Sequence, residues 1–191
     1  MANTNAAFGL KAIGKVGQNR DAQGLSEYSI AASTAVIYNS DPVALSADGV
    51  LVRGTAGADN YLLGSLNGVY YTDSSTGKPT WSNYLAASNA ATDIVGFVAD
   101  DPYQRFEIQC NSTLAAADVF ANANITVAAG VAANYVSRSE LNKATLDTTN
   151  TLQLKIVGIS KDPDNSDTAS ANVNLVVQLN THYAKSTTGV L

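Results

Sequence analysis

The chain has 191 residues, of which 14% are charged and 46% hydrophobic, with 11 Lys and Arg against 16 Asp and Glu. This length predicts one domain, or one domain with a substantial insertion, and the low charge favours an oligomer or a lattice component. The acidic balance argues against nucleic acid and anionic membrane partners, and a single cysteine, Cys110, excludes an intrachain disulfide.

The first 20 residues differ from the rest of the chain. They contain three bases, Lys11, Lys15 and Arg20, and no acid, so they carry +3 while residues 21–191 carry −8. Three glycines interrupt any helix, and the segment has neither a helical nor a strand period. We therefore predict an extended N-terminal arm over residues 1–20 and a single β-rich body over 21–191. The arm also lacks the apolar core of a secretory signal, and no apolar run is long enough to span a bilayer, so we expect synthesis in a cytoplasm.

The body is predicted to consist of short strands. Asp48-Gly49 lies between the apolar runs 41–45 and 50–52, which indicates a tight hairpin. Further strands are predicted at 26–31, 35–38, 61–64, 68–71, 94–98, 105–110, 151–159 and 172–180. The last two are expected to form an antiparallel pair. The spacing predicts a mainly β fold, an antiparallel β-sandwich or a barrel-like body. One or two short helices are expected within 113–124 and 137–146, the second with Ser139 as a plausible cap.

Few residues are suited to catalysis. His182 is the only histidine, and we expect it at the surface; one His and one Cys do not make a zinc site. Asp100 and Asp101 would point to opposite faces of a strand, and Pro102 favours a turn there. The Asp-rich loop at 162–167 is read as solvated rather than as a cation site, since it lacks the glycine and distal glutamate of a calcium loop. A pair of carboxylates for glycoside hydrolysis is an alternative that the sequence does not exclude, but the sequence points to no particular pair. We expect no enzyme, metal or cofactor.

Four aromatic residues, Tyr70, Tyr71, Trp81 and Tyr84, bracket the polar loop 72–80. Tyr and Trp bury a large apolar body while keeping a polar tip in water. We therefore favour a place in the core or at a subunit interface, with a sugar- or ligand-binding platform as the other possibility.

Several stretches resemble small structural proteins of tailed bacteriophages. These are the start Met-Ala-Asn-Thr-Asn-Ala-Ala-Phe-Gly-Leu-Lys at 1–11, Asp41-Pro42-Val43 ahead of a hairpin, TDSSTGKPTW at 72–81 with Phe97-Val98, and the closing Val-rich strand near Asn180. Lys11-Ala12 stands where those proteins often have Arg-Pro, and Ser40 where they have Gly. The chain is most similar to the head decoration, or capsid cement, proteins.

This resemblance implies a virion protein on the capsid exterior that bridges subunits of the major capsid protein and has no catalytic residues. It also implies a homo-oligomer, a dimer or trimer. The arm is then the expected contact segment, with Phe8, Leu10, Lys11, Ile13 and Lys15 as its capsid-binding residues. Its apolar side chains would supply affinity, and its bases would meet acidic patches. The alternative is a tail or fibre module that binds a receptor or glycan through the four aromatic residues.

Overall fold

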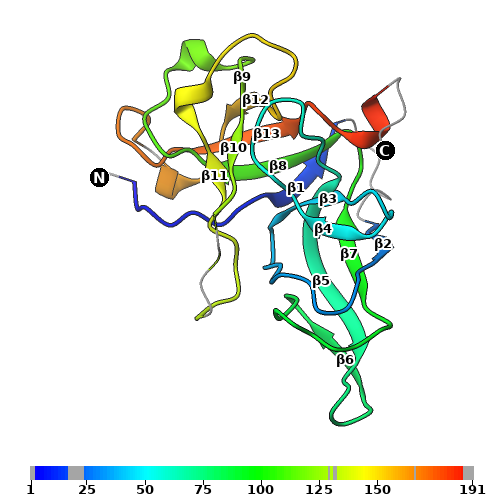
Figure 1. Cartoon of the computed structure of the whole chain (residues 1–191). Coiled ribbons are helices and arrows are strands. Elements are labelled where there is room, and N and C mark those ends of the chain that lie inside the picture. The colour runs from blue at the N-terminus through cyan, green and yellow to red at the C-terminus, as the bar shows by residue number, and fades with distance from the viewer. Residues whose placement is uncertain (1–2, 17–23, 129, 131–132, 166, 187–191) are drawn as a thin grey trace.

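The computed structural model describes residues 3–16, 24–128, 130, 133–165 and 167–186 (Figure 1). The protein is mainly β, with 38% strand and 7% helix, and its antiparallel sheets pack as a sandwich without closing into a barrel. This confirms the predicted fold class and decides between its two forms. Arg20, one of the three bases of the predicted arm, lies outside the described residues.

One sheet has five strands in the order β1-β8-β13-β12-β9. Their bounds are Lys11–Lys15, Gln104–Gln109, Asn174–Leu179, Leu154–Ile159 and Asn122–Ala123. The β12–β13 pair is antiparallel, as the sequence predicts for the last two strands. Strand β1 pairs with β8 at the edge of this sheet, so part of the predicted arm belongs to the body.

The second sheet follows the order β2-β7-β5-β3-β4, with β6 paired to β5. The bounds are Ser26–Ser29, Val95–Ala99, Gly64–Thr72, Pro42–Leu45 and Leu51–Arg53, and Pro79–Ser82 for β6. The predicted hairpin is the β3–β4 pair, and Gly49 adopts a φ of 73° in its turn, which glycine accepts without strain. In the view of Figure 1, β6 lies at the end of the molecule away from the five-stranded sheet.

The remaining elements are short. Strands β10 (Ile125–Thr126) and β11 (Glu140–Leu141) pair, and single 3-10 turns lie at Ala116–Asp118, Lys143–Thr145, Pro163–Asn165 and Tyr183–Lys185. The helices predicted within 113–124 and 137–146 are therefore reduced to one such turn each. Asn142, not Ser139, caps the second, because its side chain accepts the amide of Ala144. Ser139 is buried and contacts Ser137 instead.

Each sheet has its own hydrophobic cluster. The five-stranded sheet contributes Phe106, Ile108, Leu154, Ile156, Leu175, Val177 and Leu179 to the first, which also holds Leu10. The second sheet contributes Val43, Leu51, Leu66, Val69 and Val98 to the other. The chain crosses from one sheet to the other between β7 and β8, through a turn at Pro102 and Tyr103.

Candidate functional site

The N-terminal segment lies along the body and is hydrogen-bonded to it. The side-chain amide of Gln109 clamps the segment, since its Oε1 accepts the amide of Ala6 at 2.9 Å and its Nε2 donates to the Thr4 carbonyl at 3.0 Å. The amides of Gly9 and Leu10 donate to the carbonyls of Ser139 and Ser40. Residues 3–10 form neither helix nor strand, and they are anchored to this chain's own body.

The five predicted capsid-contact residues of the arm fall into different environments. Leu10 is fully buried in the core of the five-stranded sheet, so this residue is not available to a partner at the surface. Phe8 is half-buried, with a groove on each side of it. Lys11 and Ile13 are exposed, and Ile13 keeps 46% of its surface in solvent. Lys15 is half-buried.

Both described bases of the arm face carboxylates of the body. The Lys15 Nζ lies 2.8 Å from Oδ2 of Asp101, and the Lys11 Nζ lies 3.6 Å from Oε2 of Glu107. The hydrogen bond from Lys15 is the main reason that the pKa of Asp101 is lowered from its ordinary value. The positive charges of Lys11 and Lys15 are therefore paired with negative charges of the same molecule.

The structure divides the four predicted interface aromatics into two pairs. Tyr70 and Trp81 are cross-strand partners on β5 and β6, with 44% and 53% of their surfaces exposed. Tyr71 is half-buried and packs against the core of the second sheet. Tyr84 is also half-buried, and its ring stacks on that of Tyr135 at a centroid distance of 3.9 Å.

The exposed pair belongs to a larger surface, which we call the aromatic face: Tyr70, Trp81, Phe97 and Val95. The Phe97 ring centroid lies 5.0 Å from that of Trp81. Gly68 lies beneath Trp81, because a Cβ at Gly68 would come within 2.4 Å of Cζ2 of the indole. The missing side chain lets the indole lie against the sheet. Sequence reasoning missed Phe97 and Val95, although their alternation with buried Gly96 and Val98 is the signal that could have found them.

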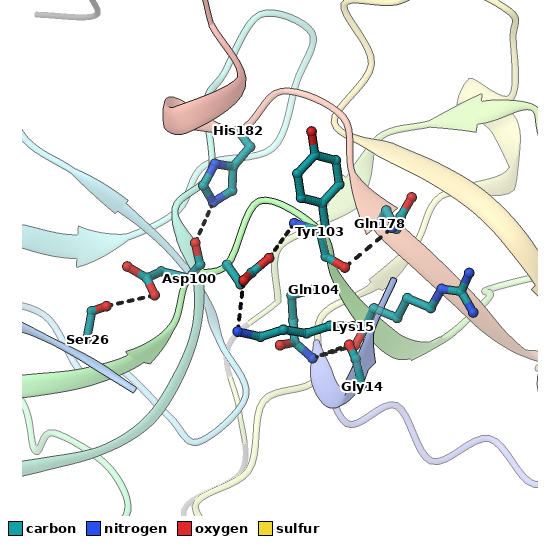
Figure 2. Close-up of polar contacts among 10 residues, drawn as sticks. Gly14, Lys15, Ser26, Asp100, Tyr103, Gln104, Gln178 and His182 are labelled. Atoms are coloured by element: carbon teal, nitrogen blue, oxygen red, sulfur yellow. Dashed lines mark hydrogen bonds and ion pairs between the residues drawn. The ribbon is translucent and has the colours of Figure 1, made fainter. Parts of the chain in front are cut away.

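A polar junction joins the two sheets at the turn between β7 and β8 (Figure 2). The Asp100 carboxylate accepts hydrogen bonds from Ser26 Oγ at 2.9 Å and Tyr28 Oη at 2.6 Å. Burial, together with this carboxylate, raises the pKa of Tyr28 to about 12. Asp101 turns instead toward Lys15 and the amide of Tyr103. The two carboxylates diverge, as predicted, and do not form an acid pair.

His182 fastens this junction and is buried, so the expectation of a surface histidine is wrong. Its Nδ1 accepts the amide of Ala184, which leaves Nε2 as the protonated nitrogen. Nε2–H then donates to the carbonyls of Leu63 and Asp100, at 2.8 and 3.0 Å. Burial lowers the pKa of His182, so the ring is neutral and acts as a structural donor. Both ring nitrogens are occupied by backbone groups.

The acidic loop after β12 binds its own backbone. Asp162 Oδ1 accepts the amide of Asp164, and Asp167 accepts the amide of Ala169 and the hydroxyl of Ser170. In the described part of the chain, no group of three or more His, Cys, Asp or Glu side chains is arranged to hold a metal ion. The same residues contain no helix that is long and apolar enough to cross a bilayer.

The sequence matches no protein-family model, and comparisons with curated proteins and with solved structures gave no significant match. The candidate surfaces are therefore defined by this chain's own geometry. They are the edge of the five-stranded sheet at β1 and the aromatic face of the second sheet.

Proposed function

We propose that this chain is a structural virion protein that binds the outside of a bacteriophage capsid and stabilises it by bridging major capsid protein subunits. The observation that carries the proposal is the presence of two exposed apolar surfaces on different sheets. One includes Ile13 and Val16, at and just after β1, and Tyr103, whose carbonyl accepts the Val16 amide at 3.1 Å. The other is the aromatic face, toward the β6 end of the molecule (Figure 1).

A bridging protein needs two separate contact surfaces, because each must hold a different subunit. Exposed apolar area of this kind is typical of protein–protein contact sites. An internally pressurised shell strains the contacts between its subunits, and a clamp across such a contact resists their separation. The proposal includes assembly as a dimer or trimer, no catalytic activity, and no nucleic acid or membrane partner.

Quantitative mass spectrometry of purified virions, with electron microscopy of immunogold-labelled particles, tests this function. We expect many copies for each particle, with label over the head. A few copies confined to the tail would contradict the proposal and favour the alternative below.

The second candidate is a tail or fibre module that binds a receptor or glycan. It is favoured by the geometry of Tyr70 and Trp81, which are paired in register on one exposed face. A sugar ring stacks on such aromatic faces. Binding to a glycan array that is lost in Trp81→Ala would support this candidate, and no binding at high valency would count against it.

A further inference from the structure

The five-stranded sheet has an outer face opposite its hydrophobic core. Along β8, Phe106 and Ile108 are buried in the core, so Arg105, Glu107 and Gln109 point to the other side. The N-terminal segment covers this outer face at Gln109, through the hydrogen bonds to Thr4 and Ala6. The end of the face near Arg105 is not covered in this way.

Three cations gather at that uncovered end, which we call the basic end: Arg105, Lys155 and Lys185, with Gln178 and Tyr103 between them. Gln178 is the register partner of both Arg105 and Lys155, so these three side chains share one face. The Lys185 Nζ lies 5.5 Å from the ring centroid of Tyr103. The Lys185 Nζ also donates to the carbonyl of Leu179 at 2.7 Å, and Leu179 is the register partner of Leu154, the residue next to Lys155.

In the described part of the chain no carboxylate forms an ion pair with these cations, although the charge of Asp101 acts on Lys185. Within the described ranges, the ion pairs are those of Lys11, Lys15 and Lys143, so neither Arg105 nor Lys155 has a carboxylate within 4.0 Å. The Nε of Arg105 is buried without a hydrogen-bond partner. Two acids close to Arg105 in the sequence have other partners: Asp101 pairs with Lys15, and Glu107 with Lys11 and the hydroxyl of Ser160.

The described residues leave space on the β1 side of Arg105. Its register partner there is Gly14, and apart from the two chain neighbours of Gly14, no atom of these residues lies within 4 Å of the position that a Cβ would take there. A side chain from another molecule therefore has room beside the guanidinium. Half-buried cations without counter-charges gain most from a partner carboxylate, because the charge-assisted hydrogen bond forms where solvent is already reduced.

The chain has a net charge of −5, so the basic end is a local excess of positive charge on an acidic protein. A surface of negative charge is complementary to it. We propose that the basic end docks an acidic patch of carboxylate side chains on the surface of the protein partner. This inference rests on the proposed function and adds the chemistry of the capsid surface that the chain recognises. Nucleic acid fits less well, because the net charge of −5 on the chain opposes binding of a long, continuous phosphate backbone.

A pair of charge reversals tests the inference. Lys155→Glu changes the basic end, and the matched control Lys78→Glu makes the same change at an exposed residue between β5 and β6. The probe is fluorescent poly-L-glutamate, followed by anisotropy at about 20 mM NaCl, where charge interactions are least screened. A duplex DNA of matched charge serves as the competing probe.

We expect the wild type and Lys78→Glu to bind poly-L-glutamate alike and Lys155→Glu to bind about tenfold more weakly. Arg105→Gln, checked for an unchanged melting temperature, is expected to weaken binding in the same direction. Equal binding by Lys155→Glu and Lys78→Glu would overturn the inference, and so would tighter binding of duplex DNA than of poly-L-glutamate.

The same variants, added to capsids that lack this protein, separate the inference from the proposed function. If the wild type binds capsids, Lys155→Glu binds them more weakly and Lys78→Glu binds them equally well, the result supports both the inference and the proposed function. Equal capsid binding by all three proteins would contradict the basic end as the docking surface while leaving the function in place. If Lys155→Glu loses poly-L-glutamate binding but the wild type does not bind capsids, the preference of the basic end for carboxylates would be supported. The proposed function would be contradicted.

Discussion

The β1 edge and the aromatic face are both exposed, but they are built in different ways. β1 and the segment before it are held by backbone hydrogen bonds, two ion pairs and one fully buried side chain, Leu10. On the aromatic face, the Trp81 ring is positioned by its contact with Phe97 and by the space that Gly68 leaves beneath it. A change in the first region is therefore expected to affect the stability of the whole body, whereas a change in the second alters the surface.

Because the arm includes both a core residue and exposed residues, its deletion and its single substitutions are expected to have different effects. Deletion of residues 2–18 would remove an edge strand together with a core residue, so loss of capsid binding would not distinguish a lost contact from a destabilised body. Single substitutions at exposed positions separate the two effects.

The largest effect is expected at Leu10. Replacing it with alanine leaves a cavity in the core of the five-stranded sheet, and Leu10→Ala should lower the free energy of unfolding by about 3 kcal/mol. Ile13→Ala is the matched control, because Ile13 is 46% exposed, and it should cost about 0.5 kcal/mol or less. Chemical denaturation measures both. Equal losses in the two variants would contradict the division of the arm into a core part and a surface part.

The next effect concerns the junction that fixes the two sheets. His182→Ala leaves the carbonyls of Leu63 and Asp100 and the amide of Ala184 without their partner, and should cost about 2 kcal/mol. Burial lowers the pKa of His182 in the folded state, so the unfolded chain binds more protons as pH falls below its ordinary value of 6.5. The wild type should therefore lose stability as pH falls below about 6.5.

That pH dependence is measured by thermal unfolding at pH values above and below 6.5. His182→Ala should be less stable at neutral pH but should lose less on acidification, since its own titration is absent. A parallel decline in the wild type and the variant would show that other groups govern the acid response.

A smaller effect is expected at Gly68. Gly68→Ala would push the indole of Trp81 off the sheet, at a cost of about 1 kcal/mol. Trp81 is the only tryptophan, so its fluorescence should shift to longer wavelength as the ring gains solvent exposure. Gly158→Ala is the control, because its added Cβ would meet no atom within 4 Å. An unchanged emission spectrum in Gly68→Ala would contradict the packing of the aromatic face.

The smallest effect is expected at the ion pair between Lys15 and Asp101. Lys15→Ala should cost about 0.5 kcal/mol near neutral pH, because the pair is partly solvated. Lys15 lowers the pKa of Asp101, so this contribution is present above the ordinary pKa of 3.8 and is lost as the carboxyl protonates at lower pH. The difference in the free energy of unfolding between the wild type and Lys15→Ala should be smaller in high salt than in low salt. A salt-independent difference would indicate lost packing rather than lost charge.

Local patterns predicted much of the fold. The β3–β4 hairpin, strands β7 and β8, and the β12–β13 pair follow from alternation and turn residues within a few positions of one another. Strand β1 could not be found in this way, because its residues are mostly exposed and its pairing with β8 joins segments about 90 positions apart. Alanine-rich 113–124 has an apparent helical period, but Phe120 takes a φ of 71°, which an α-helix does not allow.

The candidate surfaces were predicted only in part. The sequence located Ile13, Tyr70 and Trp81, which the structure leaves exposed. It also grouped Leu10 with the surface residues, because burial against a distant sheet has no local signal. The basic end combines residues from three segments: the register of the sheet brings Arg105 and Lys155 together, and the turn after β13 adds Lys185.

The central claim is that this chain bridges capsid subunits through two surfaces, and cryo-electron microscopy of intact virions tests it most directly. We expect density for this fold on the outside of the head, with the β1 edge and basic end against one major capsid subunit and the aromatic face against another subunit. Density confined to the tail, or a head-bound copy that touches one subunit through one surface, would contradict it.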